Sequence, residues 1–94
     1  MIISDIMRLE ALVTGEVQAV GFRYWTLKQA QQLRLSGSAA NQNDGSVRII
    51  AEGEQPDVEE LLRRLRSGRT PGQVENVEAT LGEGTGALTG FDTR

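Results

Sequence analysis

The spacing of the apolar residues alternates along the chain between a period of two and a period near 3.6, and this alternation restricts the fold more than any other feature. In residues 8–14 every second side chain is apolar, as in a half-buried strand. In residues 22–35 the spacing changes to three and four, as on the buried face of a helix, through Phe22, Thr26, Ala30 and Leu33. Residues 1–7 show no clear period, and we expect them to form a loose leader.

The middle of the chain repeats this change of period. Asp44-Gly45 favours a tight turn between residues 38–43 and 46–51, which predicts a hairpin of two strands. Residues 55–66 follow the helical spacing most closely. Their apolar positions are Val58, Leu61, Leu62 and Leu65.

The C-terminal part returns to the spacing of a strand in residues 74–81, and we expect Phe91–Arg94 to add a short edge strand. The predicted order is strand, helix, strand, strand, helix, strand, and right-handed crossovers place both helices on one face of the sheet. We therefore predict an α/β (α+β) two-layer sandwich of the ferredoxin-like type with a mostly antiparallel sheet. A length of 94 residues fits a single domain over residues 1–94.

The composition excludes several kinds of chemistry. The chain contains no cysteine and no histidine, so thiol nucleophiles, imidazole bases and the usual zinc ligands are absent, and we expect no metal site. A net charge of −3 disfavours nucleic-acid partners, which are held mainly by surplus Lys and Arg. No apolar run approaches the roughly 20 residues of a membrane-spanning helix. We therefore expect a cytoplasmic protein that binds neither nucleic acid nor a membrane.

The loop between the first strand and the first helix is the leading candidate for a binding site. It begins at Gly15 and ends at Gly21, residues that tolerate a positive φ. Peptide N–H groups converge in such loops next to the positive end of the helix dipole, so that the loop stabilises an anion. Arg23 in the first helical turn opposes the dipole, but its guanidinium would grip a phosphate in the loop. Without further observations, a solvated Arg23 with an acidic neighbour explains this residue equally well.

Asn41 is the second candidate. Asparagine is rare inside strands, and this one lies just before the predicted hairpin turn. A hydrogen bond to the local turn backbone is the structural alternative to a functional role.

Both candidates lie in motifs that resemble those of the acylphosphatase family. The segment Gly15-Glu-Val-Gln-Ala-Val-Gly-Phe-Arg23 resembles the family signature Gly-x-Val-Gln-Gly-Val-x-Phe-Arg. The segment Gly37-Ser-Ala-Ala-Asn-Gln-Asn-Asp-Gly45 resembles the second block, Gly-Trp-Val-x-Asn-x-x-x-Gly, and the spacing between the blocks also matches. The resemblance extends from about Arg8 to the C-terminus.

The resemblance implies hydrolysis of small acyl phosphates to a carboxylate and inorganic phosphate, with no metal or organic cofactor. It makes Arg23 the phosphate-binding arginine and Asn41 the residue that orients the attacking water. It also implies that the substrate is bound along the loop, by Gln18, Ala19, Val20, Gly21 and Phe22. We expect such an enzyme to act as a monomer.

Three positions depart from the family pattern. Ala19 stands where the family prefers glycine, and a left-handed backbone there would cost an alanine about 1 kcal/mol. Ser38 replaces the usual tryptophan, and Ala40 stands where a basic residue is common. A catalytically silent domain that only binds an anion is therefore the main alternative.

Other domains with the same order of elements bind RNA or small regulatory molecules, because a fold does not determine a function. One Trp, one Tyr and two Phe leave few rings for base stacking. Together with the negative net charge, this argues against RNA binding.

Overall fold

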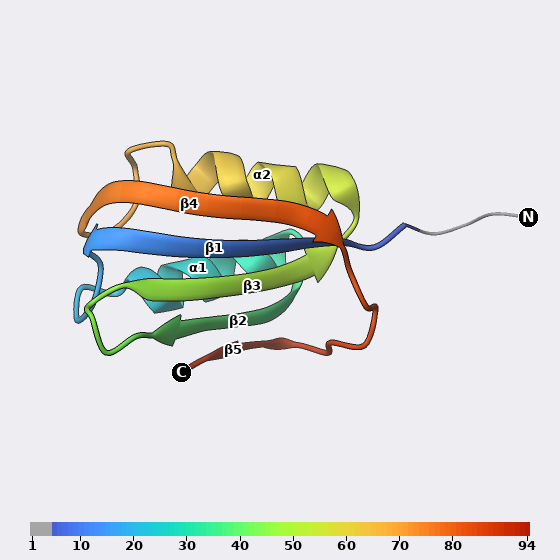
Figure 1. The fold of residues 1–94 in the computed structure, drawn as a ribbon, viewed down its shortest axis with the longest axis horizontal. Coiled ribbons are helices and arrows are strands. Elements are labelled where there is room, and N and C mark those ends of the chain that lie inside the picture. Colours follow the sequence, from blue (N-terminus) through green and yellow to red (C-terminus); the bar gives the residue numbers. More distant parts are fainter. Residues whose placement is uncertain (1–4) are drawn as a thin grey trace, which may run out of the picture.

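The computed structural model describes residues 5–94, which form a five-stranded sheet with two helices on one of its faces (Figure 1). The elements are β1 (Met7–Glu16), α1 (Phe22–Gln32), β2 (Ser36–Asn41), β3 (Val47–Gly53), α2 (Gln55–Leu65), β4 (Gln73–Glu83) and β5 (Phe91–Thr93). The predicted order and the C-terminal edge strand are confirmed. Residues 1–4 of the predicted leader lie outside the described part of the chain, and Met7 already belongs to β1.

The strands lie in the order β4-β1-β3-β2-β5. The first four strands of this order pair antiparallel with one another, as predicted. The edge strand β5 runs parallel to β2, so the sheet is mixed. This pairing sets Thr93 opposite Ala39 and brings the end of β5 next to the end of β2, where Asn41 lies. The C-terminus is therefore close to one of the candidate site residues (Figure 1).

The core lies between the sheet and the helices. The inward side chains of β1 and β3 include Leu9, Val13, Val47 and Ile49, each with no exposed surface. The helices cover them with the predicted apolar positions, which are buried or packed against the buried cluster: Phe22, Thr26, Ala30, Leu33, Val58, Leu61, Leu62 and Leu65. Thr26 is the polar member, and its hydroxyl donates to the carbonyl of Phe22 at 2.9 Å. Alternate strand residues are thus buried under the apolar faces of the two helices, which confirms the predicted strands and helices.

Helix α1 ends three residues before the predicted boundary at Leu35. Arg34 has a φ of 58°, a left-handed conformation that cannot continue a right-handed helix. The N–H of Leu35 then donates to the carbonyl of Ala30 at 2.8 Å, and its side chain turns into the core, where it is 4% exposed. The apolar side chain of Leu35 therefore belongs to the turn that closes α1 and not to the helix.

A buried carboxylate holds the connection between β4 and β5 in place. Glu52 is 3% exposed and accepts hydrogen bonds from Arg8 Nη1 at 2.8 Å, from the Thr85 N–H at 3.1 Å and from the Gly86 N–H at 3.0 Å. Burial by itself raises the pKa of Glu52, but these donors outweigh it and hold the pKa below its usual value. The ionised carboxylate is therefore the form that fits this site.

We expect Glu52→Gln to lower the free energy of unfolding at neutral pH by about 1–3 kcal/mol, because buried donors lose their ionised partner. A carboxyl whose folded-state pKa is lowered stabilises above its ordinary value of 4.5, and this contribution disappears as the pH falls through the lowered pKa. The difference between the wild type and the variant should therefore shrink in acid. Denaturant unfolding at pH 7 and pH 3 measures it.

Glu78→Gln is the matched control, since Glu78 is exposed on β4. Its effect on stability should be small at both pH values. A stability difference for Glu52→Gln that stayed constant between pH 7 and pH 3 would contradict the role assigned to the charge.

Candidate active site

The loop between β1 and α1 curves through two left-handed residues. Ala19 has a φ of 61°, and Gly21, the N-cap of α1, has a φ of 84°. The left-handed backbone whose cost we considered for Ala19 is therefore present. Glycine adopts this conformation freely, whereas alanine is strained by its Cβ. The chain thus retains the shape of the loop at a cost in stability.

The loop presents main-chain donors that the protein itself does not use. Within residues 5–94, the N–H groups of residues 18–22 have no acceptor. The N-cap of α1 makes no side-chain hydrogen bond, and its first turn contains no acidic residue. Helix α2, by contrast, carries Asp57 in its first turn. The N-terminus of α1 therefore has free N–H groups and an uncompensated positive dipole end, which favour an anion.

A hollow of about 140 Å³ lies over this N-terminus. Its lining residues are Val17, Ala19, Gly21, Phe22, Arg23, Tyr24 and Thr93. Among the residues predicted to bind substrate or act in catalysis, Ala19, Gly21, Phe22 and Arg23 therefore border one cavity. Val17, Tyr24 and Thr93 were not predicted. Thr93 is contributed by β5, and only the pairing of β5 with β2 brings it here.

Arg23 and Asn41 share one hydrogen-bond acceptor. The guanidinium of Arg23 donates through Nη1 to the main-chain oxygen of Arg94 at 2.8 Å, and the main-chain N–H of Asn41 donates to the same oxygen at 2.7 Å. Because both donors bond the same oxygen, Nη1 of Arg23 and the main-chain nitrogen of Asn41 lie close together. Asn41 does not line the hollow itself, but its carboxamide makes no hydrogen bond within residues 5–94 and is available to a ligand.

The side chain of Gln18 braces the loop. Its Nε2 donates to the carbonyl of Gln42 at 2.8 Å and to the carbonyl of Ser46 at 2.9 Å, both in the connection between β2 and β3. That connection also contains a hydrogen bond from the N–H of Gln42 to the carbonyl of Ser46 at 2.8 Å. The Gln18 carboxamide is therefore occupied with the protein, and Gln18 is not among the residues that line the hollow.

The connection between α2 and β4 supports the loop from the other side. A Cβ on Gly72 would lie 2.0 Å from the carbonyl oxygen of Glu16 and 2.7 Å from Cγ2 of Val20, so only glycine permits this approach. Val20 is 41% exposed and lies outside the lining of the hollow, against Gly72.

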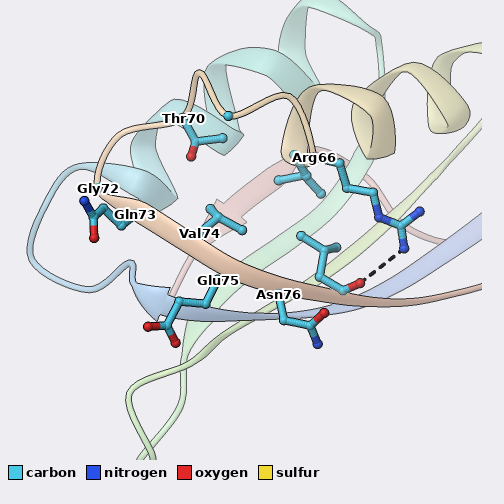
Figure 2. Close-up of a pocket in the computed structure, with 10 residues that line it drawn as sticks. Arg66, Thr70, Gly72, Gln73, Val74, Glu75 and Asn76 are labelled. Atoms are coloured by element: carbon cyan, nitrogen blue, oxygen red, sulfur yellow. Dashed lines mark hydrogen bonds between the residues drawn. The ribbon is translucent and has the colours of Figure 1, made fainter.

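A larger hollow, of about 750 Å³, lies between the end of α2 and β4 (Figure 2). Its lining contains one arginine, Arg66, whose guanidinium already donates to the carbonyl of Val77 at 3.2 Å. Glu75 and Asn76 also line it. Because this hollow has a carboxylate and no free main-chain donors at a helix N-terminus, the smaller one is the better anion site despite its size.

Within residues 5–94, no group of three or more Asp or Glu side chains is arranged to hold a metal ion. In the same residues, neither helix is long and apolar enough to span a bilayer.

The fold and the hollow define a small α+β sandwich whose first helix presents an anion site at its N-terminus. The acylphosphatase family model matches residues 9–93. The chain belongs to the acylphosphatase family, whose enzymes hydrolyse acyl phosphates.

Curated relatives named acylphosphatase cover nearly the whole chain. The relative from Paenarthrobacter aurescens (strain TC1) is 46% identical over 87 residues, which is 93% of each chain. The relative from Thermobifida fusca (strain YX) is 48% identical over 88 residues, 94% of this chain and 97% of its own. The relative from Corynebacterium glutamicum (strain R) is 54% identical over 81 residues, 82% of this chain and 86% of its own.

Solved acylphosphatase structures have the same fold. The crystal structure of acylphosphatase from Bacillus subtilis matches with a TM-score of 0.87 at 26% identity, over 94% of this chain and 98% of that one. The acylphosphatase from Coxiella burnetii matches with a TM-score of 0.81 at 29% identity, over 96% and 94%. These relatives are named as enzymes, and the comparisons give no support to the alternative of a catalytically silent domain.

We expect Ala19→Gly to raise the free energy of unfolding by about 0.5–1 kcal/mol, because relief of the left-handed strain exceeds the entropy that glycine adds to the unfolded chain. Thermal and denaturant unfolding measure this. Ala87→Gly is the matched control, since Ala87 is exposed and has no positive φ. That variant should lose up to about 1 kcal/mol, and equal effects at the two positions would contradict the strain.

Proposed function

We propose that this chain hydrolyses small acyl phosphates with Arg23 as the phosphate-binding side chain and Asn41 as the residue that orients the attacking water. The observation that supports this most is the shared acceptor: the guanidinium of Arg23 and the backbone of Asn41 both donate to the main-chain oxygen of Arg94. The cationic group and the end of β2 therefore belong to one site. The N–H groups of residues 18–22 would supply the remaining donors to the phosphoryl oxygens.

The proposed reaction needs little beyond positioning and charge stabilisation. The water oxygen attacks phosphorus in line, the bond from phosphorus to the acyl oxygen breaks, and the carboxylate leaves with the electron pair. A carboxylate is a good leaving group, so no general acid has to protonate it. Arg23 uses one of its five N–H donors in the hydrogen bond to Arg94. The others remain available to the equatorial phosphoryl oxygens.

The water proton goes to a phosphoryl oxygen of the substrate or to solvent. The chain has no histidine and no cysteine to accept it. The Asn41 carboxamide oxygen would accept a hydrogen bond from the water and so hold the nucleophile toward phosphorus. This places the chemistry on a guanidinium, a carboxamide and main-chain N–H groups.

We also propose that the enzyme acts as a monomer. The open edge strand β4 carries Glu75, Glu78 and Glu83, and such charges oppose pairing with the same strand of a second copy. The single-domain organisation over residues 1–94 and the cytoplasmic location stay predictions from the sequence.

We expect Arg23→Ala to lower kcat/KM for benzoyl phosphate about 100- to 1,000-fold, because a donor to the transition-state oxygens is lost. Arg69→Ala is the matched control, since Arg69 is exposed and its guanidinium makes no hydrogen bond within residues 5–94. Asn41→Ala should chiefly lower kcat, by about 100-fold, whereas Asn43→Ala should not. Steady-state release of inorganic phosphate measures all four. Normal turnover by Arg23→Ala would refute the proposal.

Chelation should leave the activity unchanged, because the proposed site stabilises the phosphoryl charge with N–H groups alone. The same phosphate-release assay, run after dialysis against EDTA and again with added Mg²⁺, checks this. Loss of turnover that Mg²⁺ restores would show that a metal ion takes part and that the proposed set of groups is incomplete.

A further inference from the structure

Tyr24 lies at the opening of the anion hollow and is not used by the chemistry above. It follows Arg23 in the first turn of α1 and lines the hollow together with Ala19, Gly21 and Thr93. Its side chain is 62% exposed. Because Cα–Cβ bonds in a helix tilt toward the N-terminus, the ring leans toward the site and not away from it.

Few large hydrophobic side chains are exposed on the described part of this protein. Within residues 5–94 the large hydrophobic side chains that remain exposed are Val20, Tyr24 and Leu81. Val20 belongs to the anion loop itself, and Tyr24 lies just beyond it. Val20 lies outside the lining of the hollow, so Tyr24 is the large exposed hydrophobic side chain of the described residues that borders it.

The other aromatic residue of this helix turn is not available for the same role. Trp25 is packed against the core and stacks on Phe22 with ring centroids 6.0 Å apart. The Tyr24 ring makes no aromatic contact within residues 5–94. Its neighbour is the ammonium of Lys28, which lies 5.9 Å from the ring centroid on one face. A cation at this distance is attracted to one face of the ring, and most of the Tyr24 side chain still faces solvent.

We propose that Tyr24 is a specificity-determining residue that receives the acyl group and favours acyl phosphates with an aromatic acyl group over those with a small one. This inference rests on the proposed function. Once the phosphoryl group occupies the 140 Å³ hollow, the acyl group must project through its opening. Tyr24 presents an aromatic face there, against which a planar apolar group buries surface that would otherwise face water.

The test compares benzoyl phosphate with acetyl phosphate in wild type, Tyr24→Ala and Tyr24→Phe. We expect Tyr24→Ala to raise KM for benzoyl phosphate about two- to tenfold, the range measured for aromatic pairs. Its KM for acetyl phosphate and both kcat values should change less than about twofold, because the phosphate donors are untouched. Tyr24→Phe keeps the ring and should match the wild type.

Gln31→Ala is the matched control, since Gln31 is exposed on the same helix away from the hollow. Inhibition constants give a second readout that does not depend on turnover. Benzylphosphonate should inhibit the wild type more strongly than methylphosphonate does, and Tyr24→Ala should remove most of this advantage. Circular dichroism and thermal unfolding confirm that the variants are folded.

Equal changes for both substrates, or no change for either, would overturn the assignment of Tyr24. Such a result leaves the proposed function intact if Arg23→Ala is still inactive toward both substrates. Normal turnover by Arg23→Ala would instead refute the proposed function, whatever Tyr24→Ala does. The two failures are therefore distinguishable in one set of measurements.

Discussion

One main-chain oxygen, that of Arg94, connects the two residues to which we assign the chemistry in our proposal. This oxygen accepts a hydrogen bond from the Arg23 guanidinium and another from the Asn41 main chain. Its position depends on β5, a strand of three residues whose parallel pairing with β2 is supported by Phe91, which is 9% exposed. Glu52 holds the chain that leads into β5. A short edge strand therefore aligns two residues that lie 18 positions apart in the sequence.

Local spacing was enough to predict the architecture because each element buries one face. Alternation through Leu9 and Val13 and the helical spacing of Val58 and Leu61 reflect the same buried layer between sheet and helices. The direction of β5 and the early end of α1 were beyond this reasoning. The first depends on which neighbour a three-residue strand meets, and the second on a left-handed Arg34 that no local preference favours.

The sequence indicated a loop with free N–H groups and an adjacent arginine, because these depend on neighbours in the chain. It did not predict that Ala19 would be left-handed, only what such a backbone would cost an alanine. The partners contributed by distant segments were missed: Thr93 in the lining, the main-chain oxygen of Arg94, and the Gly72 contact that fits only a residue without a Cβ. The predicted edge strand Phe91–Arg94 already indicated that Thr93 and Arg94 would lie beside another strand of the sheet. Nothing in the chain indicated which strand it would join.

The two hydrogen bonds of the Gln18 carboxamide have a kinetic consequence. They tie the anion loop to the turn after β2, and Gly72 holds the loop from the opposite side. A loop braced on both flanks is preorganised, so its dipoles need no reorganisation when substrate arrives. In the proposed mechanism, catalysis would require no gating motion of this loop, unlike in enzymes in which closure of a mobile segment limits turnover. Electrostatic attraction of the dianion and its diffusion to an open site would govern the encounter.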